Sequence, residues 1–350
     1  ALSTPSSPPS SSASPQSSAR PSLMANPSVP APPSSSAEPD DALDDDDAPE
    51  SERPALTWRG VRLNVFLFVL TVVSLFWTGM EPGEGFLSGA LYAVPLLAIL
   101  LAHEFGHYFA ARYHGVPASL PYFIPLPKLG FGTLGAVIAM RDRIRSRNAL
   151  LDIGASGPLA GMLVAIPVLI VGLMHSPVSV SVPPYYQEGQ SLLYLALKRL
   201  VLGPIPAGSD VHLNAMANAG WVGLFLTMIN LLPFGQLDGG HVAYALLGER
   251  QNRIGPWVRR ATLPLLALNL AWFVGPQLSH PSTMGIITAV NNSLFWLVWF
   301  GVLGLLQRFS GKGHPPYEPG ELGLARKIIG WVCVVLFVVL FMPTPLSTVN

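Results

Sequence analysis

Residues Phe86–Ala111 read FLSGALYAVPLLAILLAHEFGHYFAA, an apolar run long enough to cross a bilayer as a single helix. Near its end, His103, Glu104 and His107 form the pattern H-E-x-x-H. Residues four apart lie on the same face of a helix, so both imidazoles can reach one metal ion. Because ionisable groups inside a membrane helix are costly, their presence here indicates a function.

The pattern H-E-x-x-H is typical of a hydrolytic zinc site. Zinc held by His103 and His107 would activate a water molecule, and Glu104 would stand beside it to accept the proton. The alternative is a pair of helix histidines hydrogen-bonded across a bundle, and that interpretation leaves Glu104 without a role. We therefore predict Zn²⁺ as the cofactor.

The composition is that of a membrane protein. Half of the 350 residues are hydrophobic and 11% are charged, whereas roughly 25% are charged in soluble domains. We expect an α-helical polytopic membrane protein embedded in a lipid bilayer. The net charge is zero, which argues against a nucleic-acid partner. With Cys333 as the one cysteine, no intrachain disulfide can form.

Residues 1–53 form a polar tail that is rich in Ser and Pro and then acidic. Without hydrophobic periodicity it cannot bury a core, so we expect it to be disordered. Met24 could be the natural initiator, with an upstream extension before it; a plastid transit peptide is the other interpretation. We favour the first, because the acidic run that follows fits no import signal.

The apolar segments predict about six to seven transmembrane helices, since about 20 apolar residues cross a bilayer. The candidates are 63–78, 86–111, 153–174, 215–247, 262–279, 286–306 and 327–342. The fourth is too long for one span, and we expect it to break between Asn230 and Gly240. Residues 311–350 would be a loop followed by the final membrane helix.

Basic residues predict the orientation, because they collect on the cytoplasmic side. With a cytoplasmic N-terminus, all clusters but one fall inside; the inner residues are Arg53, Arg59, Arg62, Arg112, Lys128, Arg141, Arg143, Arg145, Arg147, Arg250, Arg253, Arg259, Arg260, Arg308 and Lys312. The outer pair, Lys198 and Arg199, lies in SLLYLALKRLVLG. This stretch predicts an amphipathic helix, either on the outer membrane surface or simply solvated.

Residues 119–140, SLPYFIPLPKLGFGTLGAVIAM, are apolar but interrupted by Pro and Gly. We expect a small β element at the membrane edge, with Gly135 to Met140 as its clearest strand. The free edge of such a strand could bind an extended peptide. A re-entrant loop that only packs against the helices is the alternative.

A hydrolytic zinc site requires a third protein ligand. Asp238, in the stretch NLLPFGQLDGGH at 230–241, is a lone carboxylate in an apolar setting and needs a cation. Pro233 and the glycines should unwind the helix, which is tolerated at membrane depth only where protein or water satisfies the backbone. Asp152, at the entry to the third span, is expected to cap its helix.

These motifs together resemble the site-2 protease family of intramembrane zinc metalloproteases, in the type that lacks a PDZ domain. H-E-x-x-H is followed in a later helix by N-x-x-P-x-x-x-x-D-G, and GTLGAVIAMRDR, SGPLAG and GQLDGGH are also similar. The resemblance implies a protease domain at 54–310 with core helices near 86–111, 153–174 and 215–247. It implies that His103, His107 and Asp238 bind zinc, that Glu104 is the general base, and that the Asn230 amide holds the substrate strand or the oxyanion.

The resemblance implies hydrolysis of peptide bonds in transmembrane protein substrates that another protease has already shortened. We expect a multi-pass protein of a bacterial inner membrane with its active site toward the cytoplasm; a plastid membrane is the alternative. A metal transporter or sensor could use the same His and Asp residues, but the chain has no internal repeat. An inactive scaffold would not need Glu104.

Overall fold

The computed structural model describes residues 58–349 except 82, 84, 129, 141–143, 145, 181, 184, 280 and 311–319. The predicted disordered tail at 1–53 lies outside the described residues, as do Arg53, Arg141, Arg143, Arg145 and Lys312 of the orientation argument.

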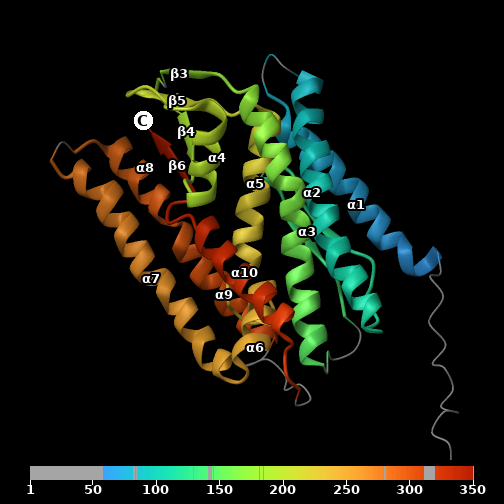
Figure 1. Ribbon diagram of the computed structural model, residues 1–350. Helices are drawn as coiled ribbons and strands as arrows, with labels where there is room; N and C mark the ends of the chain where they lie inside the picture. Colours follow the sequence, from blue (N-terminus) through green and yellow to red (C-terminus); the bar gives the residue numbers. More distant parts are fainter. Residues whose placement is uncertain are drawn as a thin grey trace, which may run out of the picture. The chain divides into compact units, whose positions relative to one another are not determined.

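The described chain is mostly helical (Figure 1). Its helices are α1 (Trp58–Gly79), α2 (Gly85–Tyr113), α3 (Arg147–Met174), α4 (Leu192–Leu202), α5 (Ala215–Asn230), α6 (Asp238–Leu247), α7 (Arg250–Gln277), α8 (Thr283–Ser293), α9 (Phe295–Ser310) and α10 (Leu324–Leu340). Its strands are β1 (Tyr122–Leu126), β2 (Gly132–Val137), β3 (Val178–Val180), β4 (Tyr185–Glu188), β5 (Ser209–Val211) and β6 (Leu346–Val349).

Helices α2, α3 and α5 pack against one another and form the centre of the protein (Figure 1). Small residues allow this approach, as is usual for helices in membranes. Gly172 of α3 lies against the backbone of Ala217, and Gly220 of α5 lies against Leu169. A side chain at either glycine would push α3 and α5 apart.

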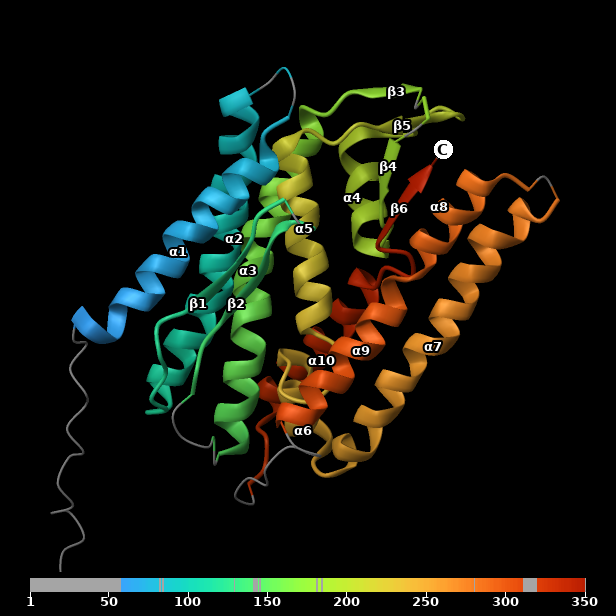
Figure 2. The same ribbon diagram turned by 180° about the vertical axis from the view of Figure 1, so that it is seen from behind.

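The predicted β element is an antiparallel hairpin of β1 and β2 that packs against α1 (Figure 2). Ser74 of α1 donates a hydrogen bond of 2.6 Å to the carbonyl of Gly132. The predicted strand at Gly135–Met140 was placed too late, because β2 ends at Val137 and Met140 makes only an isolated bridge to Ala118.

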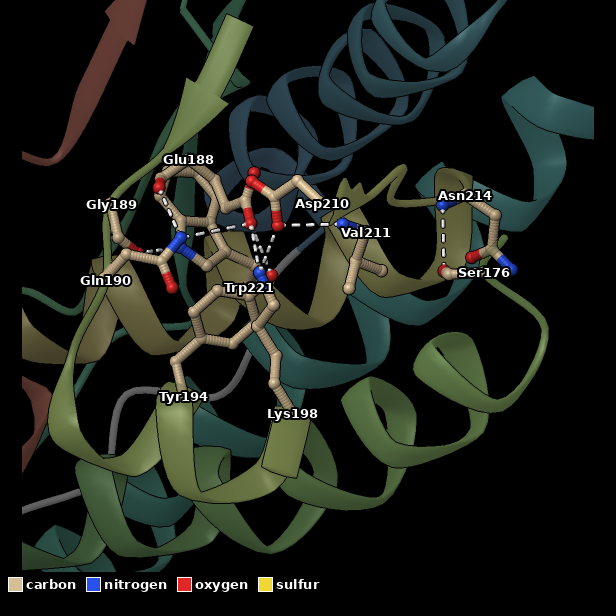
Figure 3. A network of polar contacts seen from close by, with 10 residues as sticks. All are labelled: Ser176, Glu188, Gly189, Gln190, Tyr194, Lys198, Asp210, Val211, Asn214 and Trp221. Carbon is tan, nitrogen blue, oxygen red and sulfur yellow. Dashed lines mark hydrogen bonds and ion pairs between the residues drawn. The ribbon is translucent and has the colours of Figure 1, made fainter. Parts of the chain in front are cut away.

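The segment between α3 and α5 contains α4, the strand pair β3–β5, strand β4 and a buried charge cluster, which Figure 3 shows. Lys198 is only 5% exposed and forms ion pairs with Glu188 at 3.3 Å and Asp210 at 3.0 Å. Tyr194 donates a hydrogen bond of 2.7 Å to Glu188. Neither interpretation of α4 anticipated that Lys198 is buried, where two carboxylates draw the ammonium group inward.

Burial and charge set the protonation of this cluster. Burial, followed by the adjacent Glu188 carboxylate, raises the pKa of the Tyr194 phenol well above its usual value, so it remains a donor. Burial alone would raise the pKa of Asp210, but hydrogen bonds from Lys198 and the Val211 N–H hold that pKa below its usual value. The cluster is therefore a fixed ion network at neutral pH.

The last four helices surround the centre on the side away from α1 (Figure 1). Helix α7 begins at Arg250, twelve positions before the predicted span. The prediction missed the first turns because they are basic and hydropathy detects only apolar residues. The predicted span 286–306 lies within the helical segment Thr283–Arg308, which is interrupted at Leu294 between α8 and α9. Helix α10 packs against α3, α4, α5 and α6.

The segment after α10 is extended and is held by side chains of α7, α8 and α9. Asn269 donates to the Pro343 carbonyl at 3.1 Å, and Trp296 donates to the same oxygen at 2.6 Å. Asn292 both donates to and accepts from the backbone of Thr348, each at 2.9 Å. Strand β6 then pairs antiparallel with β4.

Four helical segments in the described part of the chain are long and apolar enough to cross a membrane. They are Val61–Gly79, Gly85–Tyr113, Arg147–Met174 and Thr283–Arg308. The membrane-protein prediction is thus confirmed in its coarse form, whereas the count of six to seven spans is not confirmed. The long predicted helix at 215–247 is broken between Asn230 and Asp238, as expected.

Candidate metal centre

Three predicted ligands meet at one point in the helix bundle. His103 and His107 lie one turn apart on α2, and Asp238 is the first residue of α6. Their ligand atoms all lie within 4.8 Å of one another. The two His Nε2 atoms are 3.1 Å apart, and the Asp238 oxygens lie 3.1 Å from His103 Nε2 and 3.3 Å from His107 Nε2.

A contact with α3 determines which nitrogen of His107 is available to a cation. Nδ1 of His107 lies 2.7 Å from the carbonyl oxygen of Ile153, which can only accept, so Nδ1 carries the proton. Nε2 is then the ring nitrogen that can bind a cation when the ring is neutral. Ligand atoms around tetrahedral zinc at 2.0–2.2 Å are about 3.3 Å apart. The spacing and the donor types therefore fit zinc.

Helix α3 supplies the wall behind the histidines through its glycines. Gly157 lies directly against the ring of His107, so that a Cβ at this position would overlap the imidazole. A Cβ at Gly161 would come within 3.3 Å of the Cβ of His103. One at Gly154 would lie 3.2 Å from the Asp238 carbonyl oxygen. Gly157 and Gly161 of the SGPLAG stretch thus let α3 touch α2, and Gly154 just before it lets α3 touch α6.

The break between α5 and α6 places Asp238 at the start of a helix. Gly235 has a φ of +53°, a left-handed conformation that favours glycine. Gly239 and Gly240 lie so close to backbone carbonyls of the preceding turn that a side chain would clash there. The side chain of Gln251 donates to the Pro233 carbonyl at 3.3 Å, which satisfies one of the freed backbone groups.

Glu104 and Asn230 border the three ligands. Glu104 is 4% exposed and follows His103 on α2, which puts it about 100° round the helix from that ligand. Asn230 is the last residue of α5, and its Nδ2 lies 3.3 Å from His103 Nε2. The five predicted site residues therefore come from three helices and gather around one buried point.

Sequence reasoning missed how α3 supports the site. The Ile153 carbonyl that orients His107 has no signature, since every residue carries one; the glycines of SGPLAG were the only hint of close approach. The predicted cap role of Asp152 was wrong. Ser146 caps α3 by accepting from the Ala149 N–H, and Asp152 lies further along the helix, where it pairs with Arg326 and His114.

Comparison with known proteins identifies the family. A sequence model described as peptidase family M50 matches residues 91–268, which include all five predicted site residues. The chain belongs to peptidase family M50. The match begins within α2 and ends within α7, so α1, α8, α9 and α10 lie outside it. The resemblance to site-2 proteases is confirmed at the level of the family.

Plant proteins named as zinc metalloproteases are similar to this chain. A protein of Oryza sativa subsp. indica named "Probable zinc metalloprotease EGY2, chloroplastic" is 34% identical over 167 residues, 46% of this chain and 30% of the relative. Arabidopsis thaliana "Probable zinc metalloprotease EGY1, chloroplastic" is 36% identical over 178 residues, 49% of this chain and 32% of the relative. The matches thus span about a third of the length of these relatives.

A solved member, a site-2 protease from Methanocaldococcus jannaschii, is similar over 75% of this chain and 92% of its own chain. The identity is 19% and the TM-score 0.33, so this likeness is too distant for residue-by-residue comparison. The zinc prediction is supported by the relatives' names and by the donor set of the cluster.

Proposed function

We propose that this M50 chain is an intramembrane zinc metalloprotease that cleaves peptide bonds of membrane-spanning proteins. One observation carries the proposal: nitrogen atoms of two histidines and a carboxylate lie within 4.8 Å of one another inside an apolar helix bundle, beside a buried glutamate. Such groups are costly in a membrane unless they serve a function. A transporter or sensor would need a polar path, whereas Glu104 has a direct role in hydrolysis.

In this mechanism His103, His107 and Asp238 would hold the ion. Zinc, when bound, supplies a Lewis acid that activates water for attack on a carbonyl. Glu104 accepts the proton of the attacking water and passes it to the leaving amine. Asn230 donates a hydrogen bond from its amide to the oxygen of the scissile carbonyl, where negative charge develops, or to the backbone of the substrate.

The proposed substrates are transmembrane helices that can be locally unwound. A helical peptide has its carbonyls hydrogen-bonded internally, so attack requires an extended segment near Glu104. The β1–β2 hairpin, packed against α1, offers an edge to which such a segment could add. Substrates already shortened by another protease would enter and unwind more easily, since less polar chain must be moved through the bilayer.

We propose an integral membrane location with the site toward the side that carries the basic clusters, such as Arg112, Arg250 and Arg253. The expected bacterial inner membrane is not confirmed. Because plant relatives carry the word chloroplastic in their names, a plastid membrane is the compartment to test first.

The proposal is tested with purified protein and a panel of single-span substrates, with and without a zinc chelator. Cleavage should stop with the chelator and return with added zinc. Glu104→Gln should bind zinc normally and lose at least ~10²-fold in rate, the low end for a general base. Turnover that survives either treatment, in protein verified to be free of other proteases, would remove the proposed mechanism.

A further inference from the structure

A charged cluster ties three helices together next to the metal centre. Arg326, in the first turn of α10, donates to both oxygens of Asp152 of α3 at 2.8–3.0 Å. His114, directly after α2, lies 2.8 Å from the same carboxylate. The side chains of Asp152 and Arg326 are 22% and 33% exposed. This cluster therefore bridges α2, α3 and α10 through one carboxylate.

A second arginine joins α3 to the helix that carries the third ligand. Arg147, the first residue of α3, donates to the carbonyls of Ala245 at 2.7 Å and Leu246 at 3.3 Å near the end of α6. It also donates to the Gly320 carbonyl, just before α10, at 3.2 Å. Cations at a helix C-terminus are favourable, so this contact fixes α6 from its far end.

The Asp152 contact lies close to the atoms that orient His107. Asp152 immediately precedes Ile153, whose carbonyl accepts from Nδ1 of His107. Gly157, little more than a turn further, lies against the same imidazole. A slide or rotation of α3 of even 1 Å would move the carbonyl away from His107 or drive Gly157 into it. The carboxylate of Asp152 resists such a movement by holding α3 to both neighbouring helices.

We propose that Asp152 is a positioning residue, and that Arg326 of α10 clamps α3 so that the Ile153 carbonyl keeps His107 aligned for the metal. The inference rests on the proposed zinc site. It gives α10, which lies outside the part of the chain matched by the family model, a defined part in that site. The clamp sets the geometry of the metal ligands, and it affects peptide hydrolysis only through that geometry.

The test compares four variants of the full-length protein in detergent: Asp152→Asn, Arg326→Gln, Arg326→Lys and Asp210→Asn. Asp210 is the matched control, because its side chain is 25% exposed and ion-paired like Asp152, but with Lys198 in the segment between α3 and α5. Zinc affinity is measured by chelator competition, and the visible spectrum of the Co²⁺-substituted protein reports ligand geometry. kcat and KM for a single-span substrate are measured alongside.

Removal of a group that orients a metal ligand lowers metal affinity about 10–100-fold. We expect Asp152→Asn and Arg326→Gln to weaken zinc about tenfold, alter the Co²⁺ spectrum and lower kcat with KM unchanged. Arg326→Lys keeps the charge but loses the two-pronged contact, so it should restore only part of the affinity. Asp210→Asn should leave zinc affinity and spectrum as in the wild type, even if it lowers thermal stability.

The outcomes separate this inference from the proposed function. Wild-type affinity and spectrum in Asp152→Asn, or an equal loss in Asp210→Asn, would overturn the clamp while leaving the protease proposal intact. Wild-type protein that binds zinc and shows the clamp effects without cleaving any substrate would overturn the protease proposal alone. A wild-type protein that binds no metal would overturn both.

Discussion

Gly157→Ala should damage the metal site through a single methyl group. Its new Cβ would overlap the imidazole ring of His107, the nearest group to it. The ring has little freedom to move, since its Nδ1 is held 2.7 Å from the Ile153 carbonyl. The overlap can therefore be removed only if His107 or the whole of α3 shifts.

The size of the effect follows from the overlap. An extra methyl group in a well-packed contact costs about 1–3 kcal/mol. If His107 takes up the shift, a loss of about 2.7 kcal/mol in binding free energy would weaken zinc binding ~10²-fold. A misplacement of about 1 Å at a catalytic group costs a similar factor in rate. We expect both losses in Gly157→Ala.

Gly161→Ala is the matched control, because its Cβ would lie 3.3 Å from the nearest atom of His103, a contact that small adjustments absorb. Zinc competition and cleavage should change by no more than about threefold there. Both variants lie on one face of α3, so a general effect of alanine on the helix would appear in both. Zinc affinity in Gly157→Ala within a factor of three of the wild type would refute the proposed role of α3.

Three further predictions concern the ligands and the orientation. Asp238→Ala should lose both zinc and activity, and full metal occupancy in the purified variant would mean that the third ligand lies elsewhere. Asn230→Ala should keep zinc but lower kcat about 10²-fold if its amide stabilises the oxyanion; unchanged kcat would remove that role. With Cys333 replaced, a cysteine at Ser146 should resist an impermeant thiol reagent in intact cells or sealed organelles, and one at Gln187 should react; the reverse pattern would invert the proposed topology.

The metal cluster could be predicted because its chemistry is local in sequence or unusual in its surroundings. His103 and His107 are one helical turn apart, so the helix alone brings them together. Asp238 stands out as an isolated carboxylate among apolar residues, and the family resemblance supplied its role. The break before it was equally readable, because Pro233 and several glycines cannot continue a membrane helix without help.

Contacts between distant segments could not be predicted in this way. Asp152 near the start of an apolar helix resembles a cap, and nothing in its neighbourhood indicates that Arg326 will approach it. The burial of Lys198 could not be predicted either, because an amphipathic pattern does not show that two carboxylates will gather around the polar side of the helix. The predicted start of α7 was wrong for a related reason. The helix begins at Arg250 with basic turns, and an apolar pattern indicates only the part of a helix that contacts lipid.

The pairing of β4 with β6 has a consequence for synthesis of the chain. Strand β4 precedes α4, whereas β6 follows α10, so the partner of β4 leaves the ribosome only after nearly all other elements. Until then β4 presents unpaired backbone groups, a risk for association with other chains. Contacts so distant in sequence form slowly. We therefore expect cellular quality control to recognise the unpaired edge of β4 on incomplete chains. Chains truncated before β6 should be degraded even where the metal centre has already formed.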